Sequence, residues 1–200
     1  RATVAAIDVR DDRVAGVLTE GGGRTPCRWA VIAAGSWSAR IGGIPPRSVP
    51  RVRPVKGQLI HLSDGPAGAP VRRNVRGVDA YLVPRSDGRL VVGATVEERG
   101  WDTSVTAGGV HELLRAAYEL VPGISELALT ETIAGLRPGS PDNAPLIGPT
   151  ELDGLLLATG HYRNGVLLTP VTADAIAALV SGQPAPSIDA FHPTRFASAA

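Results

Sequence analysis

The sequence predicts two fold classes in one chain, an α/β domain that is interrupted by an α+β domain with an antiparallel sheet. Continuous apolar runs at 29–34 and 155–159 are typical of strands that are buried on both faces of a parallel sheet. Between them, an Asp-Gly turn at 87–88 separates two further apolar runs, which is a strong signal of an antiparallel hairpin. This order indicates a discontinuous first domain with an inserted second one.

The composition is that of an ordinary globular protein. Hydrophobic residues make up 44% and charged residues 20% of the 200 residues, which predicts one or two folded domains. The net charge of +1 gives no reason to expect a strongly anionic partner such as a nucleic acid. No apolar stretch approaches the roughly 18–20 residues of a membrane span.

Three residue types bear on where the protein works and how complete the chain is. Cys27 is the one cysteine, so no internal disulfide forms, and a reducing, cytoplasmic location is expected. The chain begins at Arg1 and has no methionine, so we expect a piece of a longer protein. Of the 20 basic side chains, Lys56 is the one lysine, a bias that we attribute to codon usage before function.

Residues 1–44 are expected to form part of the first domain. Short apolar runs at 3–10 and 13–19 predict two strands. The buried strand that follows them stops at Gly35, and Ser36 is the expected N-cap of a short helix.

Several prolines mark a change of architecture, and residues 45–134 are expected to form the inserted antiparallel-sheet domain. Apolar residues recur at helical spacing between Thr106, the expected N-cap, and Pro122, where the helix is expected to end. The rest of the segment is expected to form strands, at 55–62, 70–75, 81–84, 90–95 and 130–136.

Residues 135–182 are expected to return to the first domain. A loop rich in proline and glycine over 137–149 precedes the second buried strand. A final helix over 173–180 follows, with Pro170 allowed in its first turn. Residues 183–200 are rich in proline and alanine and are expected to form a surface tail.

Most catalytic motifs are absent from the sequence. One cysteine and four scattered histidines cannot supply a zinc site, so no metal is expected. There is no Gly-x-Ser-x-Gly elbow, no P-loop and no Gly-x-Gly-x-x-Gly. The arginine-rich segment 47–76 has no aromatic residue on which bases would stack, so no nucleic-acid partner is expected.

The turn at 160–170 is the most informative local feature. It follows a buried strand and precedes a helix, whose first N–H groups are unpaired and favour an anionic or electron-rich ligand. Gly160 and Gly165 would let the backbone approach that ligand closely, and Arg163 lies in the same turn. An ordinary connection with an exposed arginine explains the same pattern, and spacing alone favours it.

Five segments in a fixed order carry a resemblance to a known family. They are AVIAAGSWS (30–38), PVKGQLI (54–60), AYLVPRSDGRLVVGAT (80–95), AGLRPGSPDNAPLIGPT (134–150) and GHYRNGVLLTP (160–170). Together they resemble the FAD-dependent amino acid oxidases of the D-amino acid oxidase and sarcosine oxidase superfamily, and most of all glycine oxidases of the thiamine-synthesis type. The resemblance implies a partial, Rossmann-like FAD-binding domain that an antiparallel-sheet substrate domain interrupts. The family's N-terminal glycine-rich motif is missing, so the chain is similar to the C-terminal half of such an enzyme.

The resemblance implies a substrate site with two arginines and a tyrosine. Arg137 would pair with the substrate carboxylate through two parallel hydrogen bonds, although without the family an exposed loop arginine is the better account. Arg163 would lie beside the flavin and help to hold the substrate, and the hydroxyl of Tyr81 would line the pocket. Val96 would face the same pocket, where its bulk would limit the size of the substrate side chain.

The resemblance also implies which residues contact FAD, and it implies no protein acid or base for the hydride step. The helix start is expected to contact the flavin ring, mainly through its backbone, and residues of two strands are expected to approach other parts of the cofactor. The expected cofactor-binding residues are His161, Tyr162, Arg163, Asn164, Gly165, Val166 and Leu167 at the turn, with Val4, Ala34 and Gly35 at the strands.

The implied reaction is the oxidative deamination of glycine or another small amino acid. Its products are a 2-oxo acid (glyoxylate from glycine), ammonia and hydrogen peroxide, with oxygen as the electron acceptor and thiamine thiazole synthesis as the expected use. A related flavin dehydrogenase or an N-methyl amino acid oxidase is the alternative within the same class. A non-catalytic fragment, or one subunit of a split assembly, is the alternative outside it. The expected partners are the substrate, oxygen and the missing N-terminal half, and a homo-oligomer is left open.

Overall fold

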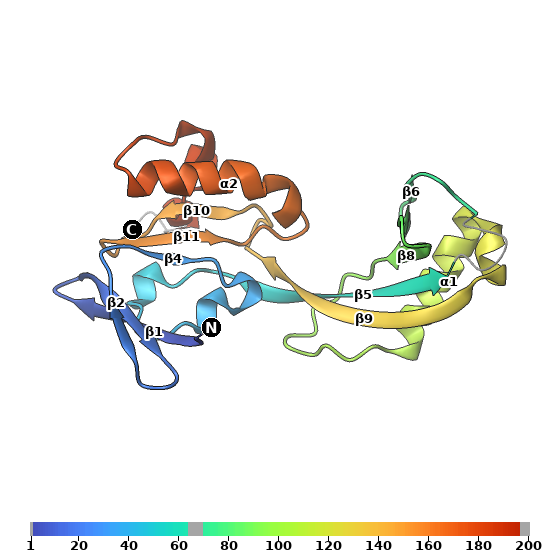
Figure 1. Ribbon diagram of the computed structural model, residues 1–200, viewed down its shortest axis with the longest axis horizontal. Helices are drawn as coiled ribbons and strands as arrows, with labels where there is room; N and C mark the ends of the chain where they lie inside the picture. Colours follow the sequence, from blue (N-terminus) through green and yellow to red (C-terminus); the bar gives the residue numbers. More distant parts are fainter. Residues whose placement is uncertain (1, 64–69, 197–200) are drawn as a thin grey trace. The chain divides into compact units, whose positions relative to one another are not determined.

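The computed structural model describes residues 2–63 and 70–196, which fall into two compact units. The first unit combines the chain up to Pro54 with the chain from Arg137 onward, and the second unit is Val55–Leu136. Figure 1 shows the elements of each unit. The first unit contains a parallel strand pair and the second contains antiparallel pairs with one α-helix, which confirms the predicted fold class.

The first unit contains two three-stranded sheets. Strands β1, β2 and β3 form an antiparallel sheet, at Val4–Arg10, Arg13–Thr19 and Arg24–Pro26. The second sheet has the order β10-β11-β4, with the strands at Leu146–Pro149, Leu155–Thr159 and Ala30–Ile32. β11 and β4 are parallel, with Leu156 opposite Val31, so two segments that lie far apart in the sequence run side by side.

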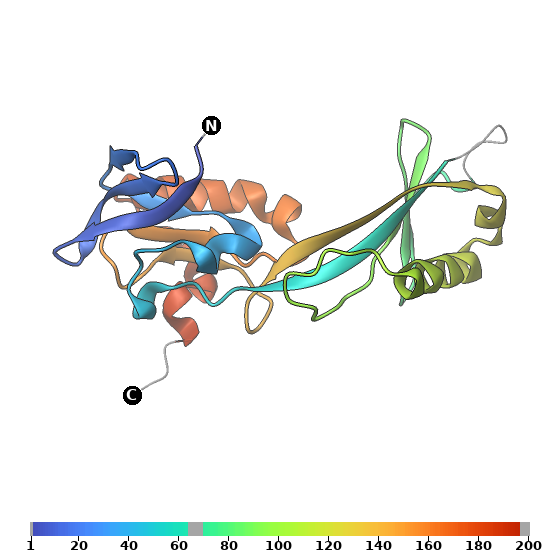
Figure 2. The ribbon, with the colours of Figure 1, turned by 90° about the horizontal axis from the view of Figure 1, so that it is seen from below.

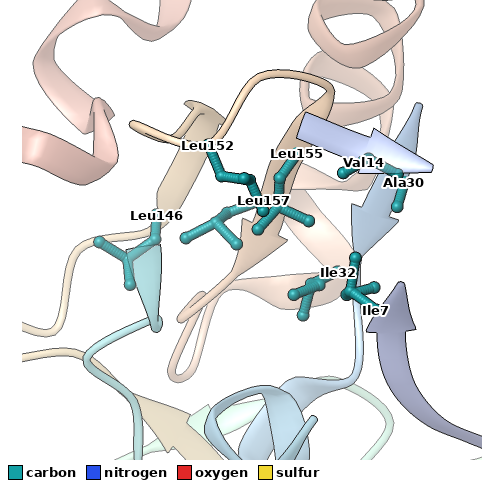
Figure 3. Close-up of a cluster of buried hydrophobic side chains, with 8 residues drawn as sticks. All are labelled: Ile7, Val14, Ala30, Ile32, Leu146, Leu152, Leu155 and Leu157. Carbon is teal, nitrogen blue, oxygen red and sulfur yellow. The ribbon is translucent and has the colours of Figure 1, made fainter. Parts of the chain in front are cut away.

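One apolar cluster packs the two sheets of the first unit together (Figure 3). Its buried members come from both sheets and from the connection between β10 and β11: Ile7, Val14, Ala30, Ile32, Leu146, Leu152, Leu155 and Leu157. Side chains alternate along a strand, so Ala30 and Ile32 face this core while Val31 faces the opposite side of the sheet.

Helix α2 (Gly165–Val180) covers part of that opposite side (Figure 1). A smaller buried cluster joins the helix, β10 and the chain that follows the helix, and its members are Ile147, Ala175 and Ile188. Because Ile188 is buried in a 3-10 helix at Pro186–Phe191, the expected surface tail is in part packed against the sheet. A second 3-10 helix follows at Pro193–Phe196.

The second unit is built on a five-stranded sheet of the order β6-β7-β8-β5-β9. Its pairs β6-β7, β7-β8 and β8-β5 are antiparallel, and β7 and β8 are the hairpin predicted around the Asp-Gly turn. The strands, in chain order from β5 to β9, are Arg53–Ser63, Val75–Arg76, Tyr81–Pro84, Arg89–Gly93 and Ala128–Gly139.

Helix α1 (Ala107–Leu120) packs on one face of this sheet (Figure 2). Thr106 caps the helix as predicted, since its hydroxyl accepts a hydrogen bond from the Gly109 N–H at 3.1 Å, and a 3-10 helix at Pro122–Glu126 ends it. The core between helix and sheet consists of Ile60, Leu62, Leu82, Leu90, Val92, Leu113, Ala117 and Ile124.

Two expected helix starts are wrong. Ser36 is not an N-cap, because the 3-10 helix Gly35–Arg40 begins directly after Ala34 and has no side-chain cap bond. Helix α2 begins at Gly165, earlier than expected, so Pro170 lies inside the helix rather than in its first turn. Packing on the sheet compensates for the hydrogen bond that a proline cannot donate, a tertiary effect that local sequence signals do not show.

Two expected segment types are also wrong. The expected loop at 137–149 contains the end of β9 and the whole of β10. The expected strand at 70–75 is reduced to the two residues of β6, which ends at Arg76. In both cases pairing with the next strand along the chain decides the outcome, since β10 pairs with β11 and the two residues of β6 pair with β7. One further 3-10 helix spans Pro46–Ser48.

Candidate functional site

The expected cofactor residues gather where the two parallel strands end. Ala34 and Gly35 follow β4, and the turn from Gly160 to Asn164 follows β11. The Thr159 hydroxyl donates a hydrogen bond to the Gly35 carbonyl at 3.2 Å, so the two strand ends are in direct contact. In open α/β sheets, ligands bind beyond the carboxyl ends of the parallel strands.

The turn after β11 has an unusual backbone. Gly160 has a φ of +74° and Tyr162 a φ of +50°, a left-handed conformation that is uncommon for a tyrosine. The Asn164 N–H donates to the His161 carbonyl at 2.9 Å, which closes the turn and directs the chain into α2. Residues in sparsely populated conformations cluster at functional sites, so this turn is a candidate for one.

The start of α2 is open to a ligand. Asn164 occupies the N-cap position without a side-chain cap bond, so no capping side chain occupies the first N–H groups of the helix. Val166 is 93% exposed and Leu167 is 77% exposed, so two adjacent apolar side chains lie open at this helix start. A Cβ added at Gly165 would have its nearest described contact at 3.8 Å, so the backbone there is accessible.

These features fit one edge of a flavin ring. A flat ring needs a surface without protruding side chains, and Gly35, with a φ of +54°, would meet no described atom within 4 Å even if it carried a Cβ. The open N–H groups of α2 favour negative charge on the nearby edge of a ligand. The strand ends and the helix start therefore suit part of an FAD site.

His161 is held in its neutral form beside this surface. Its Nε2 lies 3.0 Å from the hydroxyl oxygen of Thr172, a buried residue of α2. Burial lowers the pKa of His161 from its ordinary value of 6.5. At pH 7 the imidazole therefore contributes contact surface and a neutral hydrogen-bonding ring rather than positive charge.

Strand β9 brings Arg137 next to the same turn. The Tyr162 N–H donates to the Pro138 carbonyl at 3.0 Å, and Gly139 forms an isolated β-bridge with His161. Arg137 directly precedes Pro138, and its side chain is half-buried. The backbone thus joins the segment of the expected carboxylate-binding arginine to the expected flavin-binding turn.

The remaining expected site residues lie in three different places. Arg163 is exposed in the turn itself, and Val4 begins β1 in the other sheet of the first unit. Tyr81 begins β7 in the second unit, where a Cβ added at Gly93 would collide with the tyrosine hydroxyl. The roles of these three residues stay predictions.

The sequence reasoning missed the buried hydroxyls that join the two strand ends. The Ser38 Oγ and the Thr159 Oγ1 lie 2.7 Å apart, and both side chains are buried. Their signal in the sequence is a hydroxyl residue at the end of an apolar run. Its meaning depends on the pairing of β4 with β11, which no local pattern shows.

Residues 2–63 and 70–196 contain neither a metal-binding cluster nor a helix that could cross a membrane. No group of three or more His, Cys, Asp and Glu side chains there is arranged to hold a metal ion. None of the helices in these ranges has both the length and the apolar character that a membrane crossing requires.

Comparison with known proteins identifies the family. The family model described as FAD dependent oxidoreductase (DAO) matches residues 1–179. The chain belongs to this family. Membership confirms the resemblance seen in the five sequence segments, and it confirms FAD as the expected cofactor.

Three relatives of this FAD dependent oxidoreductase are longer proteins. The bifunctional protein ThiO/ThiG of Synechocystis sp. is 43% identical over 199 residues, which are 97% of this chain and 29% of that protein. The hydrogen cyanide synthase subunit HcnC of Pseudomonas aeruginosa is 36% identical over 191 residues, 92% of this chain and 44% of that protein. The crystal structure of glycine oxidase from Geobacillus kaustophilus aligns with a TM-score of 0.84 at 35% identity, over 97% of this chain and 52% of that one. The chain thus spans about half, or less, of each.

Proposed function

We propose that the full-length protein is an FAD-dependent oxidase of glycine or another small amino acid, and that this chain supplies its substrate clamp and part of its flavin site. One observation carries the proposal. The last residues of β9, which directly follow Arg137 in the same strand, are hydrogen-bonded to the turn before α2. A guanidinium that binds a carboxylate, beside a surface that suits a flavin, is the arrangement that oxidation at the α-carbon of an amino acid needs. The similarity to a glycine oxidase supports a small substrate.

In this proposal the residues of the chain position the substrate and do not transfer protons. FAD, when bound, supplies the chemistry by accepting a hydride from the α-carbon. Arg137 pairs with the substrate carboxylate through two parallel hydrogen bonds, which orients the α-carbon. Arg163 adds a second positive charge, and the N–H groups at the start of α2 favour negative charge on the ligand edge beside them. Overall, amino acid, oxygen and water give 2-oxo acid, ammonia and hydrogen peroxide.

We infer further that the rest of the flavin-binding domain covers an apolar face of the first unit. Within the described residues β4 is an edge strand of its sheet, and Val31 on it is 42% exposed. Parallel sheets are normally buried on both faces, so this edge and this face suit an additional strand and helix. A stripe along α2 borders the same face, and it consists of Val166, Thr169, Ala173, Ile176 and Val180.

The activity is tested by oxygen consumption of the flavin-loaded, full-length protein with glycine, sarcosine and D-alanine in separate assays. We expect uptake with at least one of them, with hydrogen peroxide formed in proportion to the oxygen consumed, and with ammonia released from glycine and D-alanine. A flavin-loaded protein that consumes no oxygen with any of the three would refute the oxidase proposal.

The need for the remaining half is tested separately, by the absorption spectrum of the purified 200-residue chain. We expect no bound flavin, because this chain holds only one part of the site. Bound FAD in the absence of any other polypeptide would show that the chain is sufficient.

A flavin dehydrogenase is the second candidate, and the similarity to a hydrogen cyanide synthase subunit favours it. Both candidates share the carboxylate clamp, and they differ in the electron acceptor. Anaerobic reduction by glycine followed by mixing with oxygen or with an artificial acceptor separates them, because an oxidase is reoxidised rapidly by oxygen. The similarity to a ThiO/ThiG protein supports thiamine thiazole synthesis as the use of the product. The cytoplasmic location stays a prediction.

A further inference from the structure

The single lysine of the chain is completely buried in the second unit. Lys56 lies on β5 with 0% of its side chain exposed, in a sequence that places arginine at its other basic positions. Its Nζ lies 2.9 Å from the Asp102 carboxylate and 3.8 Å from the Glu97 carboxylate. A buried cation is costly unless it is paired, and replacement of such a pair by apolar side chains is often stabilising. Stability alone therefore does not explain this lysine.

The partners of Lys56 belong to the segment between β8 and α1. The Glu97 Oε1 accepts hydrogen bonds from the Gln58 side-chain amide at 2.8 Å and from the Thr95 hydroxyl at 2.6 Å. The Thr106 N–H in turn donates to the Gln58 Oε1 at 2.9 Å. Residues 94–106 are thus fastened to one end of β5 by a connected polar network.

The two carboxylates of this network are ionised at neutral pH. The hydrogen bond from Lys56 lowers the pKa of Asp102. Burial of Glu97 opposes ionisation, but the hydrogen bonds from Thr95 and Gln58, together with the Lys56 charge, lower its pKa. The ammonium therefore faces two carboxylates, and the segment that carries them is drawn toward β5.

Backbone pairing with β5, together with the side-chain network, sets which way Val96 points. The backbones of Lys56 and Glu97 exchange two hydrogen bonds of 2.9 Å, so the segment continues the sheet beside β5. The side chains of Thr95 and Glu97 both reach Gln58, which contacts the start of α1. Val96 lies between these two residues and therefore points to the opposite face, where its side chain is 52% exposed.

Tyr81 occupies this same face of the second unit. The next residue, Leu82, is buried in the core under α1, so Tyr81 points away from the helix. Its ring lies over Gly93, which is paired with Tyr81 across the β7–β8 hairpin. Gly93 is the last residue of β8, three residues before Val96. The face opposite α1 therefore presents the two residues of the second unit, Tyr81 and Val96, for which the resemblance implies a substrate role.

We propose that Lys56 is a positioning residue: its ion pairs with Glu97 and Asp102 hold the segment that carries Val96 against β5, so that Val96 lies on the face opposite α1 and restricts the size of the substrate side chain. The inference rests on the proposed oxidase function. A compact ammonium with three donors suits two carboxylates in a closed site, whereas a planar guanidinium needs more space. This accounts for a lysine at the one buried basic position among the described residues.

The test compares four forms of the full-length holoenzyme: wild type, Lys56→Met, Val96→Ala and the double variant. The measured quantity is the ratio of kcat/KM for D-alanine to kcat/KM for glycine. We expect each single variant to raise this ratio about tenfold, since one methylene group of pocket space changes discrimination by at least that factor. The double variant is expected to match the single variants, because Lys56 acts through Val96.

A second variant and a binding measurement protect the test from a folding defect. Asp102 is exposed on one side, so Asp102→Asn is expected to fold and to raise the ratio in the same direction. Perturbation of the flavin spectrum gives the dissociation constants of acetate and isobutyrate. We expect the ratio of the isobutyrate constant to the acetate constant to be lower in the variants than in wild type. Arg115→Met, which breaks an exposed ion pair with Glu119 on α1, is the control and leaves both ratios unchanged.

Three results separate the possible failures. An active wild type whose ratio is unchanged in both Lys56→Met and Asp102→Asn overturns this inference alone, as does a double variant whose effects simply multiply. A flavin-loaded wild type that is inactive on every small amino acid overturns the proposed function, and this inference with it.

Discussion

At the scale of single residues, Arg137 is held near the turn before α2 by backbone contacts of the two residues that follow it. The Tyr162 N–H donates to the Pro138 carbonyl, and Gly139 forms a β-bridge with His161. Arg137 directly precedes Pro138, so the backbone beside the arginine is fixed to the candidate flavin-binding turn. A side chain on an anchored strand holds its ligand with little loss of conformational freedom. This supports a clamp rather than a loosely held surface charge.

Replacement of Arg137 by alanine is expected to raise the KM for the amino acid while FAD stays bound. Loss of a desolvated, charge-assisted partner costs at least about 2 kcal/mol, or about thirtyfold in KM. Steady-state kinetics of the full-length enzyme, with the flavin content measured in parallel, check this. Arg10→Ala removes a largely exposed arginine from the same unit and serves as the control. An unchanged KM in the Arg137 variant would remove this residue from the site.

The depressed pKa of His161 leads to a pH prediction. Its pKa is lower in the folded protein than its ordinary value of 6.5, so the unfolded chain binds a proton more readily. The histidine therefore contributes stability above pH 6.5, which is lost as the pH falls through the folded pKa. The measurement is denaturant unfolding of wild type and His161→Gln at a series of pH values from above 6.5 downward. The free energy of unfolding should fall more steeply in wild type, and parallel curves would contradict the burial of this imidazole.

At the scale of elements, α2 and β5 each combine two functions. Helix α2 has an open start that suits a ligand and a buried middle that packs on β10 and β11. Strand β5 carries Ile60 and Leu62 in the core under α1, whereas Lys56 and Gln58 on the same face form the polar network. In α2 the candidate ligand-binding residues lie at the start of the helix, and in β5 the polar network lies on the part of the strand that precedes its apolar core residues.

Substitution of Gly165 by valine is expected to weaken FAD binding without unfolding the protein. A Cβ there meets its nearest described atom at an ordinary 3.8 Å, so the fold has room, but the larger side chain would block close approach of a flat ring. Flavin retention and thermal unfolding of the apoprotein are the two measurements. Gly21→Val, at a position with no described atom within 4 Å of the added Cβ, is the matched control. Full flavin occupancy in the Gly165 variant would argue against a flavin at this helix start.

At the scale of the whole molecule, helix α2 covers only part of one face of the parallel strand pair in the first unit. Buried side chains of β1 and β2 pack on one side of this strand pair (Figure 3), but Val31 and the stripe along α2 lie open on the other side. Relatives that are about twice as long or longer have additional chain to cover such a face.

Introduction of a charge on this stripe is expected to destabilise the full-length protein. Ala173→Glu would bury an unpaired carboxylate if the rest of the flavin-binding domain covers the stripe, with a loss of more than about 2 kcal/mol. The free energy of unfolding and the flavin content measure the effect. Ala107→Glu makes the same change at an exposed position in the first turn of α1, where an acidic residue is tolerated. Equal stability of the two variants would show that the stripe remains in water.

Local patterns in the sequence determined the elements whose signals are contained within a few residues. The hairpin around Asp87 and Gly88, the capped helix α1 and the buried strand β11 were all predicted, because turn chemistry, capping and apolar runs act over short distances. Only the tertiary structure decided the rest. The pairing of β4 with β11, the extension of β9 to the turn at His161 and the burial of Lys56 all join residues that are far apart in the chain. Such contacts depend on which partner a strand finds, and no local pattern specifies that partner.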